Sequence, residues 1–232
     1  METQKPEGAP DVMEFAAWRP FFTTDAGVVT GSDMIGSGFA FQMREDSKPV
    51  FVTAFHLLGT AGGLERDLHP GDLSDSVETT FLSDVFGATD GVKQIGAPYQ
   101  PCDQDTAQEF VDTDVVAFDL VGRFKPTMLE LSNHPIQLGQ RLWMVTAVFA
   151  GASPSQKCHA VKVLDVKGGK IRYRFENDRL SLKATDGAPL LFDSGKVAGM
   201  HQGGSTDDEG VFGQGVSSEA LRQAIDSMCL EE

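Results

Sequence analysis

The segment Val50-Phe-Val-Thr-Ala-Phe-His56-Leu-Leu58 carries a histidine at the end of a run of apolar residues. Short runs that are rich in Val and Phe are typical of buried β-strands. A histidine at this point is, by itself, most often a packed core side chain. Its meaning therefore depends on the residues that the rest of the chain provides.

Two further segments follow at longer range. Thr113-Asp-Val-Val-Ala117 begins a second apolar run with Asp114, which lies 58 residues after His56. Ala184-Thr-Asp-Gly-Ala-Pro189 places Asp186 another 72 residues on. An aspartate that heads a strand is usually a cap, and a Gly-x-Pro turn is common in β proteins. The order and spacing of the three segments together are much less common than any one of them.

The remaining pattern indicates β structure. Short apolar runs separated by Gly, Pro, Asp and Ser recur along the chain, whereas helical periodicity is scarce. Gly168-Gly169 and Gly195 predict hairpins over residues 166–171 and 192–197. The expected strands are Ser37–Met43, Val50–Ala54, Val115–Leu120, Arg141–Phe149, Ala160–Lys167, Lys170–Phe175, Pro189–Phe192, Lys196–His201 and Phe212–Val216.

One helix is expected, at the C-terminal end of the chain. Ser217 or Ser218 can cap it, and Leu221, Ile225 and Met228 recur on one of its faces.

The middle of the chain has a different character. Residues 61–119 contain 13 acidic residues and only two basic ones, and the interval Gly59–Asp112 lacks regular alternation. We expect long surface loops here, joined by short strands or turns. The acidic charge predicts a solvated face or a surface that suits a basic partner.

Taken together, the three segments resemble the trypsin/chymotrypsin-fold serine peptidases. The resemblance covers roughly residues 30–230 and includes Gly36-Ser-Gly-Phe39 before the histidine. It implies an all-β fold of two six-stranded antiparallel β-barrels, with a cleft between them and a C-terminal α-helix. We expect residues 1–125 to form the first barrel, and residues 126–232 to form the second barrel and the helix.

The resemblance also implies roles for these side chains. His56 would act as general base and then as general acid, and Asp114 would fix its tautomer and stabilise the imidazolium. The backbone N–H groups of Ala184 and Asp186 would form the oxyanion hole. The nucleophile of this family is a serine, and here that position is Asp186.

A carboxylate changes the chemistry at this position. With a pKa of about 4 it is a poor nucleophile toward an amide, and it offers His56 no proton to remove. It would instead pair with His56, hold the imidazole protonated and repel a developing oxyanion. Thr185 points away at the elbow and Ser194 is out of register, so neither is expected to replace the nucleophile. We predict an inactive endopeptidase relative, by natural loss or by substitution of its active site.

The resemblance extends to the pocket for the residue before the scissile bond. Leu180 would lie at its base, and the absence of a carboxylate there argues against Lys or Arg in the substrate. Gly199-Met-His-Gln-Gly-Gly204 resembles the Gly-x-His-x-Gly-Gly segment of glutamyl endopeptidases and picornavirus processing proteases. His201 would donate an N–H to a Glu or Gln side chain, unless it is a buried strand histidine. The predicted pocket residues are Leu180, Ser181, His201, Gln202 and Gly203.

Composition excludes several classes of partner. With 19 Lys and Arg against 34 Asp and Glu, the net charge is −15, which argues against nucleic acid and anionic membranes. There is no membrane span or signal peptide pattern, so we expect a cytoplasmic protein. Cys102, Cys158 and Cys229 have no metal-binding or disulfide spacing, which predicts free thiols. No metal and no cofactor is expected.

Three functions are open at this stage. The first is a peptidase-family protein with a pocket that favours Glu or Gln. The second is a pseudo-peptidase that keeps the cleft in order to bind a peptide or protein partner. The third, a sugar- or metal-binding β protein, rests only on Asp103-Gln-Asp105, which lacks the rest of a calcium-loop pattern.

Overall fold

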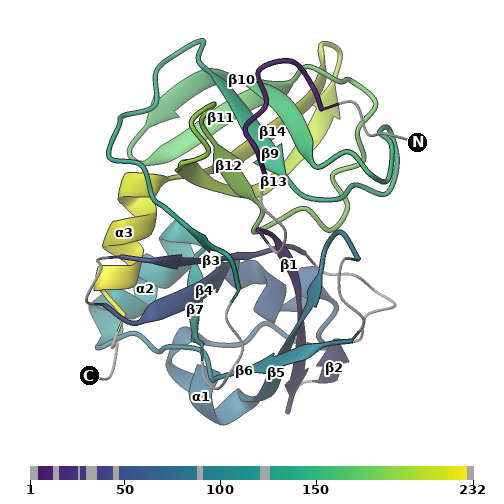
Figure 1. Cartoon of the computed structure of the whole chain (residues 1–232). Coiled ribbons are helices and arrows are strands. Elements are labelled where there is room, and N and C mark those ends of the chain that lie inside the picture. The colour runs from purple at the N-terminus through teal and green to yellow at the C-terminus, as the bar shows by residue number, and fades with distance from the viewer. Residues whose placement is uncertain are drawn as a thin grey trace.

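Most of the chain is β structure, as expected. The computed structural model describes residues 5–12, 16–25, 27–29, 36–43, 47–87, 91–120 and 126–228. Its strands form two groups, one above the other in Figure 1, and the C-terminal helix runs along one side of both.

The second half of the chain forms a closed barrel of six antiparallel strands. Its order is β10-β11-β14-β13-β12-β9. Apolar residues alternate with polar ones along its strands, and the apolar ones stabilise the barrel from inside. Ile171, Tyr173 and Phe175 of one strand, for example, all point into it. The strands are β9 (Arg141–Val145), β10 (Cys158–Lys167), β11 (Lys170–Phe175), β12 (Pro189–Leu191), β13 (Val197–Asp207) and β14 (Gly210–Ser217).

Both predicted hairpins are present. Gly168 and Gly169 have φ of 56° and 77°, the left-handed values that a tight turn between β10 and β11 requires. Gly195, with φ of 82°, closes the turn between β12 and β13, where Phe192 N–H donates to the Lys196 carbonyl at 2.9 Å.

The first half contains two four-stranded sheets, in the orders β2-β1-β5-β6 and β7-β4-β3-β8. Two isolated bridges, Trp18 to Gly38 and Pro98 to Phe118, join these sheets. Six of the strands therefore follow one another in a ring, β1-β5-β6-β7-β4-β3. The bounds are β1 (Trp18–Thr24), β2 (Gly27–Val29), β3 (Phe39–Gln42), β4 (Pro49–Thr53), β5 (Val77–Asp84), β6 (Lys93–Ile95), β7 (Val116–Asp119) and β8 (Met128–Leu129).

The acidic interval is more regular than predicted. It holds the eight-residue strand β5 and the ten-residue helix α2 (Gln104–Thr113). A reciprocal capping box of Asp103 and Thr106 begins α2, and its C-cap is Asp114. Buried Thr80 breaks the apolar alternation of β5, so the pattern did not reveal that strand. The short helices are η1 (Phe55–Leu58), η2 (Thr60–Gly62), η3 (Pro70–Asp72) and α1 (Leu73–Ser76).

The expected C-terminal helix is α3 (Ser218–Asp226), and Ser217 caps it by accepting from Ala220 N–H at 3.2 Å. Its buried face packs against α2 and joins an apolar core that both halves share. That core includes Phe118 from the first half and Trp143 from the second. A smaller core fills the interior of the second barrel.

The N-terminal segment crosses to the other half. The carbonyl of Glu7 accepts from Arg141 at 3.3 Å, and Ala9 is buried in the shared core. Residues 5–12 thus lie against the second barrel (Figure 1). The expected division at residue 125 stays a prediction.

The prediction of three free thiols is wrong. Cys102 is disulfide-bonded, whereas Cys158 is a buried free thiol and Cys229 lies outside the described residues. Pro101 pairs with Met228 in an isolated bridge, so the segment that holds Cys102 lies beside the end of the last helix. Spacing along the sequence does not reveal that proximity. The cysteines therefore give no support to the expected cytoplasmic location. Within the described ranges, every helix is too short or too polar to span a bilayer.

Candidate active site

His56 and Asp114 form a doubly bonded pair. His56 lies in η1, directly after β4, and its backbone N–H donates to Asp114 Oδ1 at 2.8 Å. Its Nδ1 lies 2.7 Å from Asp114 Oδ2. The carboxylate thus holds both the backbone and the ring of His56, which fixes the ring with Nδ1 protonated and Nε2 directed away from Asp114.

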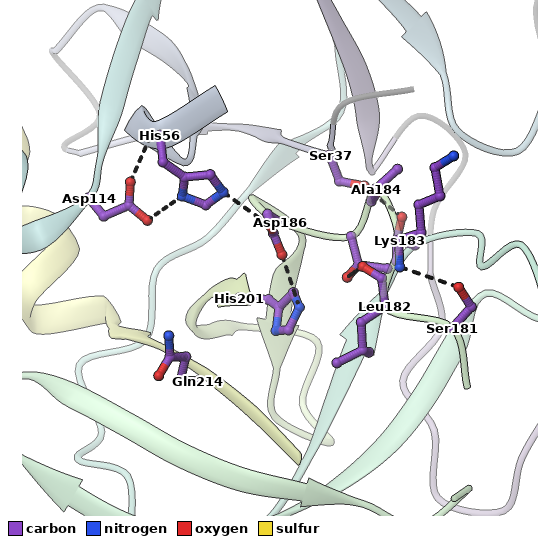
Figure 2. Close-up of polar contacts among 12 residues, drawn as sticks. Ser37, His56, Asp114, Ser181, Leu182, Lys183, Ala184, Asp186, His201 and Gln214 are labelled. Atoms are coloured by element: carbon purple, nitrogen blue, oxygen red, sulfur yellow. Dashed lines mark hydrogen bonds and ion pairs between the residues drawn. The ribbon is translucent and has the colours of Figure 1, made fainter. Parts of the chain in front are cut away.

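Asp186 faces the other side of this ring. Its Oδ2 lies 3.1 Å from His56 Nε2, and its Oδ1 lies 3.4 Å from His201 Nε2. Figure 2 shows the carboxylate between the two imidazoles. Gly187 follows with φ of 91°, and a Cβ there would lie 1.9 Å from the Ser37 carbonyl oxygen. The turn that presents Asp186 therefore requires glycine at this position.

The two carboxylates set the charge of His56. Burial lowers its pKa, but the hydrogen bonds and charges of Asp114 and Asp186 outweigh burial and raise the pKa to about 10. His56 is therefore an imidazolium at neutral pH. A protonated ring cannot accept a proton, so the histidine is in the wrong state for a general base.

The turn before Asp186 presents two free donors. Ala184 has φ of 59°, the left-handed region that an L-residue seldom occupies. Neither Ala184 N–H nor Asp186 N–H donates to another described residue. Two N–H groups that flank a reactive position in this way can stabilise an oxyanion, provided that no negative charge lies beside them.

His201 is the deepest polar group of the site. It is fully buried, and burial lowers its pKa to about 4, so the ring is neutral at physiological pH. Its Nδ1 contacts the hydroxyl of buried Tyr173, whose pKa burial raises. Its Nε2 faces the Asp186 carboxylate, which can only accept. This arrangement favours the tautomer with the proton on Nε2 and with Tyr173 donating to Nδ1.

Comparison with known proteins identifies the architecture. No family model and no curated protein matches the chain. A human pathogenic astrovirus serine protease matches with a TM-score of 0.55 at 16% identity, over 92% of this chain and 95% of that one. The active form of the Mycobacterium tuberculosis protease Rv3671c matches with a TM-score of 0.57 at 11% identity, over 100% and 93% of the two chains. An inactive form of Rv3671c matches with a TM-score of 0.52 at 11% identity, over 93% and 90%.

The chain has the chymotrypsin fold. In this fold the reactive residues lie where the two barrels meet, which is where His56, Asp114 and Asp186 lie in this chain. Their contacts agree with the predicted proximity, whereas their chemical roles stay predictions.

The two alternative nucleophiles lie elsewhere. Thr185 is buried, and its hydroxyl donates to the Leu182 carbonyl at 2.7 Å. Ser194 lies exposed in the turn between β12 and β13. Within this chymotrypsin-fold chain, Asp186 is the side chain that faces His56 Nε2.

The predicted pocket residues differ in what they contact. Ser181 Oγ accepts from Lys183 N–H at 3.4 Å, and Figure 2 draws Leu182 between Ser181 and His201. Leu180 is buried in the core of the second barrel. Gly203, with φ of 139°, borders the site, because a Cβ there would lie 4.0 Å from Asp186 Oδ1.

Gln202 differs from the other predicted pocket residues. Its amide nitrogen donates to the carbonyls of Thr113 and Asp114, at 2.6 and 2.7 Å. The side chain is therefore directed at the residue that holds His56.

Two cavities adjoin the pair formed by His56 and Asp114. One of about 550 Å³ is lined by His56, Leu68 and Val111, and most of its lining is apolar. The other, of about 390 Å³, is lined by Asp114, Lys170 and Gln202. Val111 lines both cavities.

Sequence reasoning missed Tyr173 and Arg19. Tyr173 lies on β11 and orients His201, and Arg19 Nη1 donates to the Ala184 carbonyl at 3.1 Å. Tyr173 alternates with Ile171 and Phe175 in an apolar strand, which makes it a core residue by pattern. Arg19 precedes the segments that carry the resemblance. In the described part of the chain, no cluster of three His, Cys, Asp or Glu side chains is placed to bind a metal ion.

Proposed function

We propose that this chain is a relative of the serine endopeptidases in which His56 and Asp114 are arranged for proteolysis and which, with Asp186 at the nucleophile position, does not hydrolyse peptide bonds. The observation that carries the proposal is the 3.1 Å contact between Asp186 Oδ2 and His56 Nε2. A serine hydroxyl at that position would be within reach of the histidine, and the Asp114 carboxylate already orients the ring.

The same contact accounts for inactivity. In a peptidase, the base takes the hydroxyl proton as the oxygen attacks the carbonyl carbon, and it then donates that proton to the leaving amine. A carboxylate has no hydroxyl proton to transfer, and Asp186 helps to keep His56 protonated. Its charge also lies beside the N–H groups that would hold the oxyanion.

Replacement of Asp186 by serine tests this proposal. We expect Asp186→Ser to react with a fluorophosphonate probe, whereas the unmodified chain and the matched variant Asp186→Ala do not. Adding His56→Ala to Asp186→Ser should abolish the labelling, because the hydroxyl then lacks its base. Absence of labelling in a folded Asp186→Ser variant would refute the peptidase assignment.

We further propose that the cleft favours Glu or Gln before the scissile bond. The neutral Nε2–H of His201 can donate to a carboxylate or an amide oxygen, as it faces the Asp186 carboxylate in this chain. A buried Lys ammonium would meet no counter-charge at Leu180, and an unpaired buried charge costs several kcal/mol. In this proposal, the Ser181 hydroxyl is a second hydrogen-bond donor to the substrate side chain.

Selectivity is measurable in the Asp186→Ser variant. We expect kcat/KM for Glu and Gln peptides to exceed that for Lys peptides by more than about a hundredfold. The ratio should fall when His201 becomes Ala. Equal turnover of Lys and Gln peptides would show that the pocket is misassigned and would leave the triad proposal intact.

A second candidate, a pseudo-peptidase that acts as a binding module, is favoured by the position of the Asp186 carboxylate. Its Oδ1 lies 3.4 Å from His201 Nε2, which makes no hydrogen bond in this structure, and its charge would repel a second carboxylate. The unmodified chain should therefore bind fluorescent Gln peptides more tightly than Glu peptides in an anisotropy titration, and binding should survive His56→Ala. Loss of all peptide binding in that variant would argue against a binding module.

A further inference from the structure

Two residues of the site have a strained backbone. Among the described residues other than glycine, only Asp114 and Ala184 have positive φ, at 55° and 59°. A left-handed conformation is unfavourable for an L-residue, although aspartate tolerates it better than alanine. Such conformations persist where surrounding contacts determine them.

Asp114 is held by a side chain from the opposite barrel. Gln202, on β13, is 8% exposed, and its amide N–H groups donate to the Thr113 and Asp114 carbonyls at 2.6 and 2.7 Å. The amide oxygen of Gln202 accepts from Lys170 Nζ at 3.4 Å. Lys170 also donates to the Thr113 carbonyl at 3.3 Å. Both carbonyls at the end of α2 thus have partners from the second barrel.

The carbonyl of Ala184, in the second half, accepts a hydrogen bond from a side chain of the first half. Arg19, on β1 of the first half, donates from Nη1 to the Ala184 carbonyl at 3.1 Å and to the Gly36 carbonyl at 3.3 Å. Its Nη2 donates to the Ala147 carbonyl at 3.3 Å. Arg19 is 8% exposed, and the described residues offer it carbonyls rather than a carboxylate. Hydrogen bonds from a charged donor are stronger than those between neutral groups.

We propose that Gln202 and Arg19 are reciprocal positioning residues, each of which reaches across from the opposite barrel and fixes one strained backbone of the site. Gln202 fixes Asp114 and, through it, His56. Arg19 fixes the turn that carries the Ala184 and Asp186 N–H groups. The significance of these contacts for catalysis rests on the proposed function, whereas the contacts themselves do not.

The proposal makes the site depend on how the barrels dock. If the barrels shifted, the Asp114 carbonyl would lose Gln202 and keep only Phe55 N–H, at 3.3 Å. The Ala184 carbonyl would lose both Arg19 and Ser37 Oγ, and both backbones could relax. A role confined to general stability predicts something different, namely that removal of these bonds lowers the unfolding free energy and leaves the properties of His56 unchanged.

Gln202→Met tests the first contact, because methionine keeps the size of the side chain and removes its donors. The matched control is Gln156→Met, since Gln156 donates a similar amide bond to the Cys158 carbonyl at 2.9 Å, away from the site. In the full-length protein, NMR titration should show the acid dissociation constant of His56 increased at least threefold by Gln202→Met and unchanged by Gln156→Met. An unchanged constant in folded Gln202→Met would overturn the role of Gln202.

Arg19→Lys tests the second contact, since lysine keeps the charge and loses the planar set of donors. The hydrogen-bonded amides of this turn are Thr185 N–H and Gly187 N–H, which donate to the Leu182 and His201 carbonyls at 3.3 and 2.7 Å. We expect their hydrogen exchange to become at least tenfold faster than in the parent chain, with exchange in β10 and β11 unaltered. Uniform acceleration, or none, would overturn the role of Arg19. Both measurements use the chain with Asp186 in place, so neither depends on whether Asp186→Ser proves reactive.

Discussion

Replacing Asp186 by asparagine removes one negative charge from the site and keeps the shape of the side chain. The charge lies 3.1 Å from His56 Nε2, and both side chains are less than one-third exposed. Asp114 remains bonded to the other ring nitrogen. We therefore expect Asp186→Asn to lower the pKa of His56 without returning it to the value of a free histidine.

The size of the effect follows from the pKa of about 10, against the ordinary value of 6.5. Two carboxylates produce this rise against the opposing effect of burial, so loss of one should lower the pKa by roughly 1–2 units. At 1.36 kcal/mol per unit, this corresponds to about 2 kcal/mol of stability. Because the folded pKa is raised, the stabilisation is fully present below pH 6.5, while Asp186 is ionised. It is lost as the pH rises toward 10.

Two measurements check this prediction. NMR titration of the His56 ring gives the pKa directly. Urea unfolding between pH 6 and pH 10.5 should show that the parent chain and Asp186→Asn differ most near pH 6 and converge at the alkaline end. The exposed residue Asp208 provides a control, because Asp208→Asn should leave the pKa of His56 unchanged. Parallel stability curves, together with an unchanged pKa, would refute the pairing of His56 with Asp186.

Three further substitutions have defined expectations. Ala184→Gly relieves a left-handed alanine, so the unfolding free energy measured in urea should be unchanged or higher by up to about 1 kcal/mol. A decrease of that size would show that the backbone of Ala184 is not strained. Gly187→Ala would place a Cβ 1.9 Å from the Ser37 carbonyl oxygen and 2.4 Å from Thr53 Oγ1, and should lower that free energy by about 3 kcal/mol; a neutral result would mean that the turn can move. Tyr173→Phe removes the hydroxyl that contacts His201 Nδ1. In an Asp186→Ser background it should reduce the preference for Gln over Lys peptides, and unaltered selectivity would show that Tyr173 does not set the tautomer of His201.

The sequence predicts the second barrel better than the first. Strands β10 and β11 alternate regularly and are joined by Gly168-Gly169, so periodicity and turn chemistry agree. In the first half, α2 is short and mostly polar, with a single fully buried aromatic residue at Phe110. The capping box of α2 is the one local sequence signal that a helix begins here. The acidic composition of the interval favoured surface loops instead.

The site shows the same division between local and long-range information. The motifs around His56, Asp114 and Asp186 predicted their proximity, because each motif carries its side chain on an element of fixed geometry. The contact of Gln202 with Asp114 depends on the docking of β13 against the end of α2, 88 residues apart in the chain. No local pattern reports such a contact, and for this reason Gln202 was assigned to a substrate pocket.

The packing of α3 against α2 has a consequence for biosynthesis. The last helix covers the buried face of an element that is made about a hundred residues earlier, and Arg222 donates to the Leu131 carbonyl between the two halves. A nascent chain that ends before Ser218 leaves Phe110 and its neighbours uncovered. Asp114 is the C-cap of α2, so the aspartate that orients His56 lacks its final packing until α3 has left the ribosome. The site is therefore completed only after residues 218–226 have been made, about a hundred residues after Asp114 itself.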